Sequence, residues 1–306
     1  MTRLAAVAAV AVAVALALPA AADAPHESRA AWPDLAADGQ AVPGGLSGVA
    51  VAADGASLLA LSDDGVLVAA EMVRDAAGRL LALRPTEVRA VLPPPGADWP
   101  DDWFHRDAEG LAVLPDGQIA IAFEGLHRVT LHETGGAFAQ WIDVPEDFAQ
   151  MPVNGGLEGV AMAPDGRLYA IPEAWRPDPT RRPVFVSGGE SWAIAAWIEA
   201  DPPHAPVGLD IDAAGRFYLL ERAHRLPALF SSRIRRFEIV DGEVRGLVTL
   251  LRTPFGRHGN LEGLSLWTRA DGARVATLVS DDNGLGVMRS EIVEYHLPDP
   301  DPEAAP

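Results

Sequence analysis

Residues 154–173, NGGLEGVAMAPDGRLYAIPE, carry the pattern that organises the whole chain. The stretch contains a glycine, a short apolar run, the turn pair Asp165-Gly166 and a second apolar run, which together are typical of a β-hairpin. The same frame recurs at residues 45–64, 107–124, 206–222 and 259–283. The anchor glycines of the five copies are Gly48, Gly110, Gly159, Gly208 and Gly263. Their spacings of 62, 49, 49 and 55 residues indicate a repeat architecture.

Alternating apolar segments follow the hairpins and predict two further strands in each of the first four repeats. These segments are residues 66–73 and 79–92, 126–132 and 138–144, 183–187 and 192–199, and 233–240 and 244–252. The pattern predicts an all-β fold, a β-propeller of five four-stranded blades. Six blades are the alternative, because the long first spacing leaves room for a degenerate half-blade. The fifth repeat has only one later strand, residues 291–297, and we expect an N-terminal strand near residues 31–35 to complete it.

Carboxylates gather at the open ends of the hairpins. If each turn pair forms a two-residue turn, three hairpins place two carboxylates directly opposite each other: Glu109 and Glu124, Glu158 and Glu173, and Glu262 and Asp281. Opposed like charges repel, so a counter-charge is required. These six residues and Asp282 are the candidate ligands of a divalent cation, and calcium is the favoured ion because calcium prefers oxygen donors. The alternative is that each carboxylate caps backbone amides or pairs with an arginine of the next blade.

Four basic residues beside the same hairpin ends are candidates for catalysis: His105, Arg106, Arg222 and His258. An arginine can bind an anionic substrate, and a histidine can act as a general acid or base. The alternatives are that the arginines neutralise the glutamates and that the histidines are ordinary loop residues.

The composition and the chain ends suggest an exported protein. Residues 1–22 read as a signal peptide, with cleavage after Ala22 or Ala24, followed by one domain at residues 23–297 and a disordered acidic tail at residues 298–306. The chain has no cysteine, so no disulfide stabilises the domain. A net charge of −19 argues against nucleic acid and anionic membranes as partners. We therefore expect a periplasmic or secreted protein whose partner is a small anionic or ester substrate.

Several motifs resemble a known family. These are LSG at residues 46–48, DAEG at 107–110, NGGLEG at 154–159, Glu221-Arg222, NLEG at 260–263 and SDDN at 280–283. In this order they resemble the phytase-like domain called "esterase-like activity of phytase", over residues 43–297. The resemblance implies a secreted bacterial propeller grouped with phytase and esterase activities. The chain departs from the family pattern at Val207, where the other later repeats carry glutamate, and at Gly284, where an aromatic residue is usual.

Three functions follow from these observations. The first is a divalent-metal-dependent hydrolase of small phosphate or carboxylic esters, in which Glu109, Glu158, Glu262 and Asp281 bind the cation. The second is a non-catalytic envelope propeller that calcium stabilises and that binds a ligand or partner. The third is a propeller hydrolase that resembles the calcium-dependent lactonases.

Overall fold

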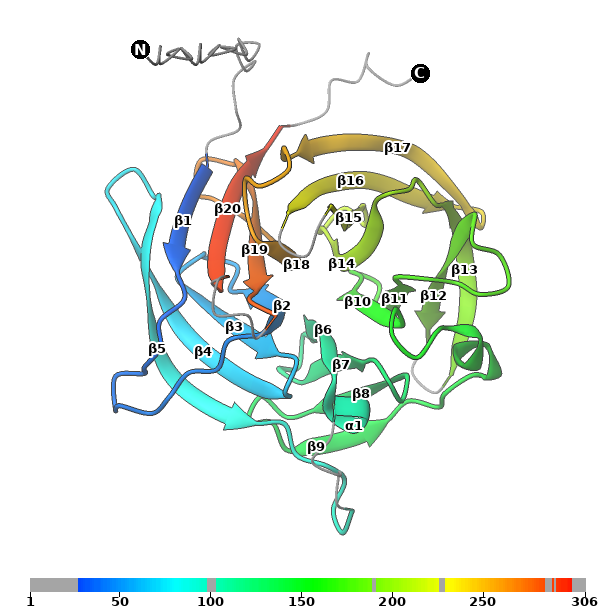
Figure 1. The fold of residues 1–306 in the computed structure, drawn as a ribbon, viewed down its shortest axis with the longest axis horizontal. Helices are drawn as coiled ribbons and strands as arrows, with labels where there is room; N and C mark the ends of the chain where they lie inside the picture. Colours follow the sequence, from blue (N-terminus) through cyan, green and yellow to red (C-terminus); the bar gives the residue numbers. More distant parts are fainter. Residues whose placement is uncertain are drawn as a thin grey trace, which may run out of the picture.

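The computed structural model describes residues 27–97, 103–188, 191–225, 229–283, 288 and 290–298. In this part of the chain, five antiparallel four-stranded sheets surround a central channel (Figure 1). We number these sheets blades 1 to 5. Five blades are therefore confirmed, and the alternative of six is wrong. The long first spacing arises in the connection between β5 (Leu80–Ala90) and β6 (Ala108–Val113), which carries the short helix α1 (Trp103–Arg106).

Each blade begins with an inner strand at the channel and proceeds outward. Blade 1 contains β2 (Leu46–Val51), β3 (Ser57–Ser62), β4 (Val66–Arg74) and β5; blade 2 contains β6, β7 (Ile119–Phe123), β8 (Arg128–His132) and β9 (Phe138–Trp141). Blade 3 contains β10 (Leu157–Met162), β11 (Leu168–Pro172), β12 (Arg181–Ser187) and β13 (Trp192–Glu199), and the 3-10 helix η1 (Glu146–Gln150) precedes it. Blade 4 contains β14 (Ala205–Ile211), β15 (Phe217–His224), β16 (Phe230–Val240) and β17 (Glu243–Arg252). The apolar core lies between neighbouring sheets.

Blade 5 closes the ring with strands from both ends of the chain. Its order is β18 (Asn260–Thr268), β19 (Arg274–Asp281), β20 (Glu291–Leu297) and β1 (Glu27–Ala31). The N-terminal strand was predicted, but its expected position at residues 31–35 is wrong. Arg74 of blade 1 donates two hydrogen bonds of 2.7 Å to Glu294 of blade 5 and lies 4.6 Å from the ring centroid of Trp267. The closing seam therefore combines strand pairing with a buried ion pair.

The hairpin turns differ from the expected two-residue type. In blade 3 the amide of Ala163 donates to the carbonyl of Arg167 and that of Gly166 donates back to Ala163, at 2.9 Å each. This is a three-residue loop, and Gly166 takes the left-handed conformation (φ +83°) that glycine adopts without strain. The extra loop residue shifts the strand register by one.

A β-bulge then shifts the register again at the open end of each hairpin. In blade 3, Leu157 pairs with Pro172 and Gly159 pairs with Ile171, so that Glu158 is the extra residue. The predicted opposition of Glu158 and Glu173 is therefore wrong. Similar bulges occur in the other blades, at Ser47, Glu109, Val207 and Glu262. For the same reason Glu109 does not face Glu124, and Asp281 pairs with Asn260 instead of Glu262. A bulge changes the direction of its side chain, which gives each blade one re-aimed residue beside the channel.

The anchor glycines allow the inner strands to approach each other. A Cβ atom on Gly159 would lie 2.7 Å from Leu209 Cβ and 2.9 Å from Leu209 N. A Cβ atom on Gly208 would lie 2.5 Å from the carbonyl oxygen of Glu262. The remaining space at this constriction is about 10 Å³, which can hold one water molecule at most. Glycine is thus required here for close packing between blades.

We expect Gly159→Ala to lower the free energy of unfolding by about 2 kcal/mol, because the added methyl group overpacks a backbone contact. Gly188 is the matched control, since a Cβ atom there meets no atom of the described residues within 4 Å. Urea unfolding of both variants tests the expectation. Equal stability of Gly159→Ala and Gly188→Ala would show that inner-strand packing does not need glycine.

Candidate metal centre

Two repeat positions place acidic side chains at one mouth of the channel. The first is the bulge position, occupied by Ser47, Glu109, Glu158, Val207 and Glu262. The second lies on the second strand, directly after the partner of the residue that precedes the bulge. It is occupied by Asp63, Glu124, Glu173, Arg222 and Asp281. We call these ten residues, with Asp107 and Asn260, the acidic mouth. Their convergence follows from the ring, because equivalent positions of every blade lie at the same end of the channel.

Three carboxylates of blade 2 lie close enough to share one ion. Asp107, Glu109 and Glu124 each offer an oxygen, and these oxygens lie within 4.8 Å of one another. Oxygens that bind calcium at about 2.4 Å are at most about 4.8 Å apart, so the group meets the distance requirement of a single cation. The donors are also of the type that calcium and magnesium prefer.

Glu124 is held in place by the neighbouring blade. Its Oε2 atom accepts hydrogen bonds of 2.8 Å from the amides of both Gly155 and Gly156, which precede β10. This side chain is buried, and the two amides fix its orientation. Among the described residues, none donates a hydrogen bond to its Oε1 atom, which can therefore serve as a ligand atom.

A polar network fills the blade 5 side of the acidic mouth. Asn260 Nδ2 donates to Glu262 Oε1 at 2.8 Å and to Asp281 Oδ2 at 3.2 Å, while Asn260 Oδ1 accepts from Arg222 at 2.6 Å. Arg222 also forms an ion pair with Glu262 and lies 3.7 Å from Glu173. Arg222 therefore neutralises part of the acidic charge, as one of the alternatives from the sequence proposed.

Burial and mutual repulsion raise the pKa values of the carboxylates. Burial, together with neighbouring acids, raises the pKa of Glu109 and of Glu158 well above the usual range. Burial raises the pKa of Glu262 to about 7, although Arg222 opposes the shift. Burial lowers the pKa of Arg222, but Glu262 and the other glutamates outweigh it and raise that pKa overall. Arg222 alone thus does not neutralise the negative charge of the acidic mouth, and an additional cation would stabilise the ionised carboxylates.

The remaining candidates lie in other surroundings. His105 and Arg106 belong to α1, directly before Asp107, and the carbonyl of His105 accepts a hydrogen bond from Arg128. His258 is buried at the closing seam, 2.5 Å from the hydroxyl of Tyr295 and 3.3 Å from Glu291. Asp282 accepts a 3.3 Å hydrogen bond from Ser290.

Glu221 lies outside the acidic mouth. It is fully buried in blade 4, where its carboxylate accepts hydrogen bonds from Arg233 and Arg235 at 2.5–3.1 Å. It occupies the repeat position of Ser62 and Phe123, one residue before the acidic position. This carboxylate is therefore used in an ion pair network between strands.

Asp107 was not among the oxygen donors predicted from the sequence, whereas Asn260 accompanied them. Both residues stand two positions before the bulge residue of their blade, so alignment of the repeats on the bulge would have found Asp107 as well. Gly284, where the chain departs from the family pattern, lies outside the described residues. The predicted signal peptide also lies outside them and stays a prediction.

Fold and site define the class of protein: a five-bladed β-propeller with an acidic channel mouth suited to a divalent cation. The chain belongs to the phytase-like family described as "Esterase-like activity of phytase", which matches residues 42–284. No curated protein matches the chain closely enough to count as similar. Within the described residues, no helix has the length and apolar character needed to cross a bilayer.

Several solved structures are similar to this chain at low identity. A PQQ-bound aldose sugar dehydrogenase from Streptomyces coelicolor is 16% identical, with a TM-score of 0.46, and the match covers 90% of this chain and 100% of that one. A calcium-binding protein, regucalcin, from Agrobacterium tumefaciens is 12% identical, with a TM-score of 0.46 and coverage of 82% and 90%. A gluconolactonase from Xanthomonas campestris is 15% identical, with a TM-score of 0.45 and coverage of 83% and 72%.

We expect Arg222→Ala to lower the free energy of unfolding by about 3 kcal/mol in metal-free buffer, because Glu262 then loses its buried counter-charge. Adding Glu262→Gln to this variant should recover part of the loss, since the uncompensated carboxylate is removed. A double-mutant cycle by chemical denaturation measures the coupling between the two side chains. Additive effects would mean that this ion pair does not stabilise the mouth.

Proposed function

We propose that this protein is a divalent-metal-dependent hydrolase of small phosphate or carboxylic esters, with its cation at the acidic mouth. The observation that carries the proposal is the group of Asp107, Glu109 and Glu124, whose oxygens fit one ion. Membership of a family described by phytase and esterase activity supports this reaction class. Lactones are cyclic carboxylic esters, so a lactonase activity falls within the same proposal.

The residues of the mouth would hold the ion and arrange the substrate around it. Asp107, Glu109 and Glu124 would bind the cation, and the amides of Gly155 and Gly156 would keep Glu124 in position. A cation there would polarise the scissile oxygen and activate water. Calcium is the proposed ion, because the donors are carboxylate oxygens.

The basic residues would have separate roles in this proposal. Arg222 is engaged by Glu262 and Asn260, so it would position the carboxylates more than it would bind substrate. His105 and Arg106 stand next to Asp107 in the chain and would contact an anionic or ester substrate. His258 would support the seam through Tyr295. We also propose that the protein is exported, on the basis of its N-terminal sequence.

A second candidate is a non-catalytic propeller that calcium stabilises. The ion pair of Arg222 with Glu262 favours this function, because it engages the guanidinium group that would otherwise bind an anionic substrate. In that case the calcium ion would stabilise the fold, and the acidic mouth would bind a ligand without hydrolysing it.

Calcium should raise the melting temperature of the wild-type protein, and chelation should lower it. At a free concentration of about 100 times its dissociation constant, one site would contribute roughly 2.7 kcal/mol. Glu158→Gln should stabilise the metal-free protein, because it removes one of several repelling charges, and it should reduce the calcium effect. The control is Glu243→Gln, whose side chain is 63% exposed in a surface pair. A wild-type melting curve that neither calcium nor chelator moves would exclude a calcium site here.

An activity screen over phosphate monoesters, short acyl esters and lactones separates the two candidates. For whichever class is hydrolysed, Glu109→Gln should lower kcat/KM at least about 100-fold, because it removes a ligand of the proposed cation, and chelation of the wild type should have a comparable effect. Glu243→Gln should keep full activity. Calcium stabilisation without turnover of any class would support the non-catalytic function instead.

A further inference from the structure

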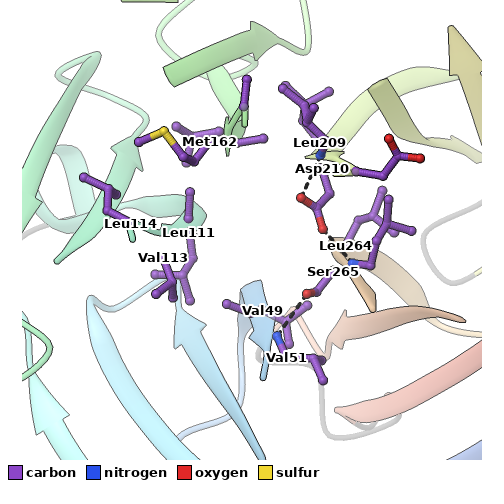
Figure 2. A pocket seen from close by; sticks show the side chains of 18 of the residues that line it. Val49, Val51, Leu111, Val113, Leu114, Met162, Leu209, Asp210, Leu264 and Ser265 are labelled. Carbon is purple, nitrogen blue, oxygen red and sulfur yellow. Dashed lines mark hydrogen bonds between the residues drawn. The ribbon is translucent and has the colours of Figure 1, made fainter. Parts of the chain in front are cut away.

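A second cavity lies at the other end of the channel. It has a volume of about 430 Å³, and its lining includes Pro115 and Pro164 of the hairpin turns. Figure 2 shows it from close by. The inner strands of all five blades form its walls. The constriction at the anchor glycines, with only about 10 Å³ of space, separates this cavity from the acidic mouth. A ligand in one site therefore does not reach the other.

The side chains that line the cavity are apolar apart from one side. The second residue after the anchor glycine is alanine in blades 1 to 3: Ala50, Ala112 and Ala161. The same repeat position carries Asp210 in blade 4 and Ser265 in blade 5. Figure 2 shows these two polar side chains close to each other on one wall, across from Leu111 and Met162. The cavity thus has an apolar side and a polar side.

Asp210 and Ser265 both connect neighbouring blades. Asp210 Oδ2 accepts a 2.6 Å hydrogen bond from the amide of Leu266 in blade 5, and its Oδ1 accepts a 2.7 Å bond from its neighbour Ile211. Ser265 Oγ accepts a 2.9 Å bond from the amide of Val51 in blade 1. A neutral hydroxyl group is therefore sufficient to connect two inner strands, so this role does not explain why blade 4 has a carboxylate.

The carboxylate of Asp210 has no counter-charge in the cavity. Among the described residues that line it, none is a lysine, arginine or histidine. The other acid of the lining, Asp212, binds Arg216 at 2.8 Å and Tyr218 at 3.0 Å. Burial raises the pKa of Asp210 to about 7, which reflects the cost of an uncompensated charge. An ionised carboxylate has about four acceptor positions, and the two backbone amides use two of them.

We propose that this cavity is a ligand site for a small organic cation, in which a primary ammonium group binds Asp210 and an apolar body contacts the leucine, valine and methionine side chains. The ammonium group supplies the positive charge that the lining lacks, and it donates to the free acceptor positions of the carboxylate. The volume falls within the range of small-molecule pockets. The proposal is independent of the function of the acidic mouth.

Binding of hexylamine and hexanol to the full-length protein tests the proposal, by calorimetry at pH 8 with saturating calcium. At this pH the amine is cationic and Asp210 is ionised, while calcium competes for the acidic mouth. We expect the amine to bind at least about tenfold more tightly than the alcohol, because a charge-assisted hydrogen bond is added. Asp210→Asn should abolish this preference and leave hexanol binding unchanged. Equal affinities of amine and alcohol for the wild type would overturn the proposal.

A second variant keeps Asp210 and fills the cavity. Val113 lines the cavity and is 44% exposed, so Val113→Trp should block the ligand without a change in the core. The control is Val240→Trp, because Val240 has a similar exposure of 46% and lies outside the lining. We expect Val113→Trp to weaken hexylamine binding at least tenfold and Val240→Trp to have no effect. Amine binding that survives Val113→Trp would belong to another site and would overturn the proposal.

Discussion

The close approach of the five inner strands is the constraint on which the rest of the structure depends. The strands meet where each anchor glycine packs against the next blade, so that a Cβ atom on Gly208 would collide with the carbonyl of Glu262. No side chain fits at this level, so the channel narrows to the space of one water molecule. The constriction divides the channel into two compartments. Within each compartment, the five blades contribute residues from equivalent repeat positions.

The bulge beside each anchor glycine determines the chemistry of the compartment at the acidic mouth. Because the bulge residue has no cross-strand partner, its side chain is free to turn toward the channel, as Glu109 and Glu158 do. Their backbone is held by the tight packing of the ring, so the carboxylates cannot move apart to reduce their repulsion. A repeat that places glutamate at the bulge of three blades therefore produces an acidic centre through geometry alone.

Blade 4 breaks the repeat at both ends of the channel. It has Val207 at the bulge and Arg222 where other blades have an acid, so it supplies a cation to an acidic ring. At the other end it has Asp210 where three blades have alanine, so it supplies an acid to an apolar ring. Both departures are visible in the sequence once the five repeats are aligned. One divergent blade thus makes the charge around the ring uneven at both ends of the channel.

Local sequence patterns predicted the fold well and the contacts less well. Five anchor glycines and their spacing favoured the correct number of blades, with six as the alternative that the long first spacing left open. The register was not predictable, because an Asp-Gly pair fits both a two-residue turn and the three-residue loop seen at Gly166. The bulge at Glu158 has no sequence signal of its own, so the gathering of carboxylates was foreseen while the pairing of Asn260 with Asp281 was not. The position of β1 depends on a strand at the far end of the chain.

Blade 5, which contains strands from both ends of the chain, also constrains the order of folding. Glu27 and Tyr295 are 268 residues apart in the chain, yet their side chains are joined by a 2.9 Å hydrogen bond. Blades 1 to 4 are each built from one continuous segment and have mostly local contacts, whereas the last blade cannot form until both ends are present. Contacts over such separations form slowly, because the chain must first lose the entropy of a very long loop. The ring can therefore be completed only after synthesis of the whole chain, which leaves the protein open until its final strand is available.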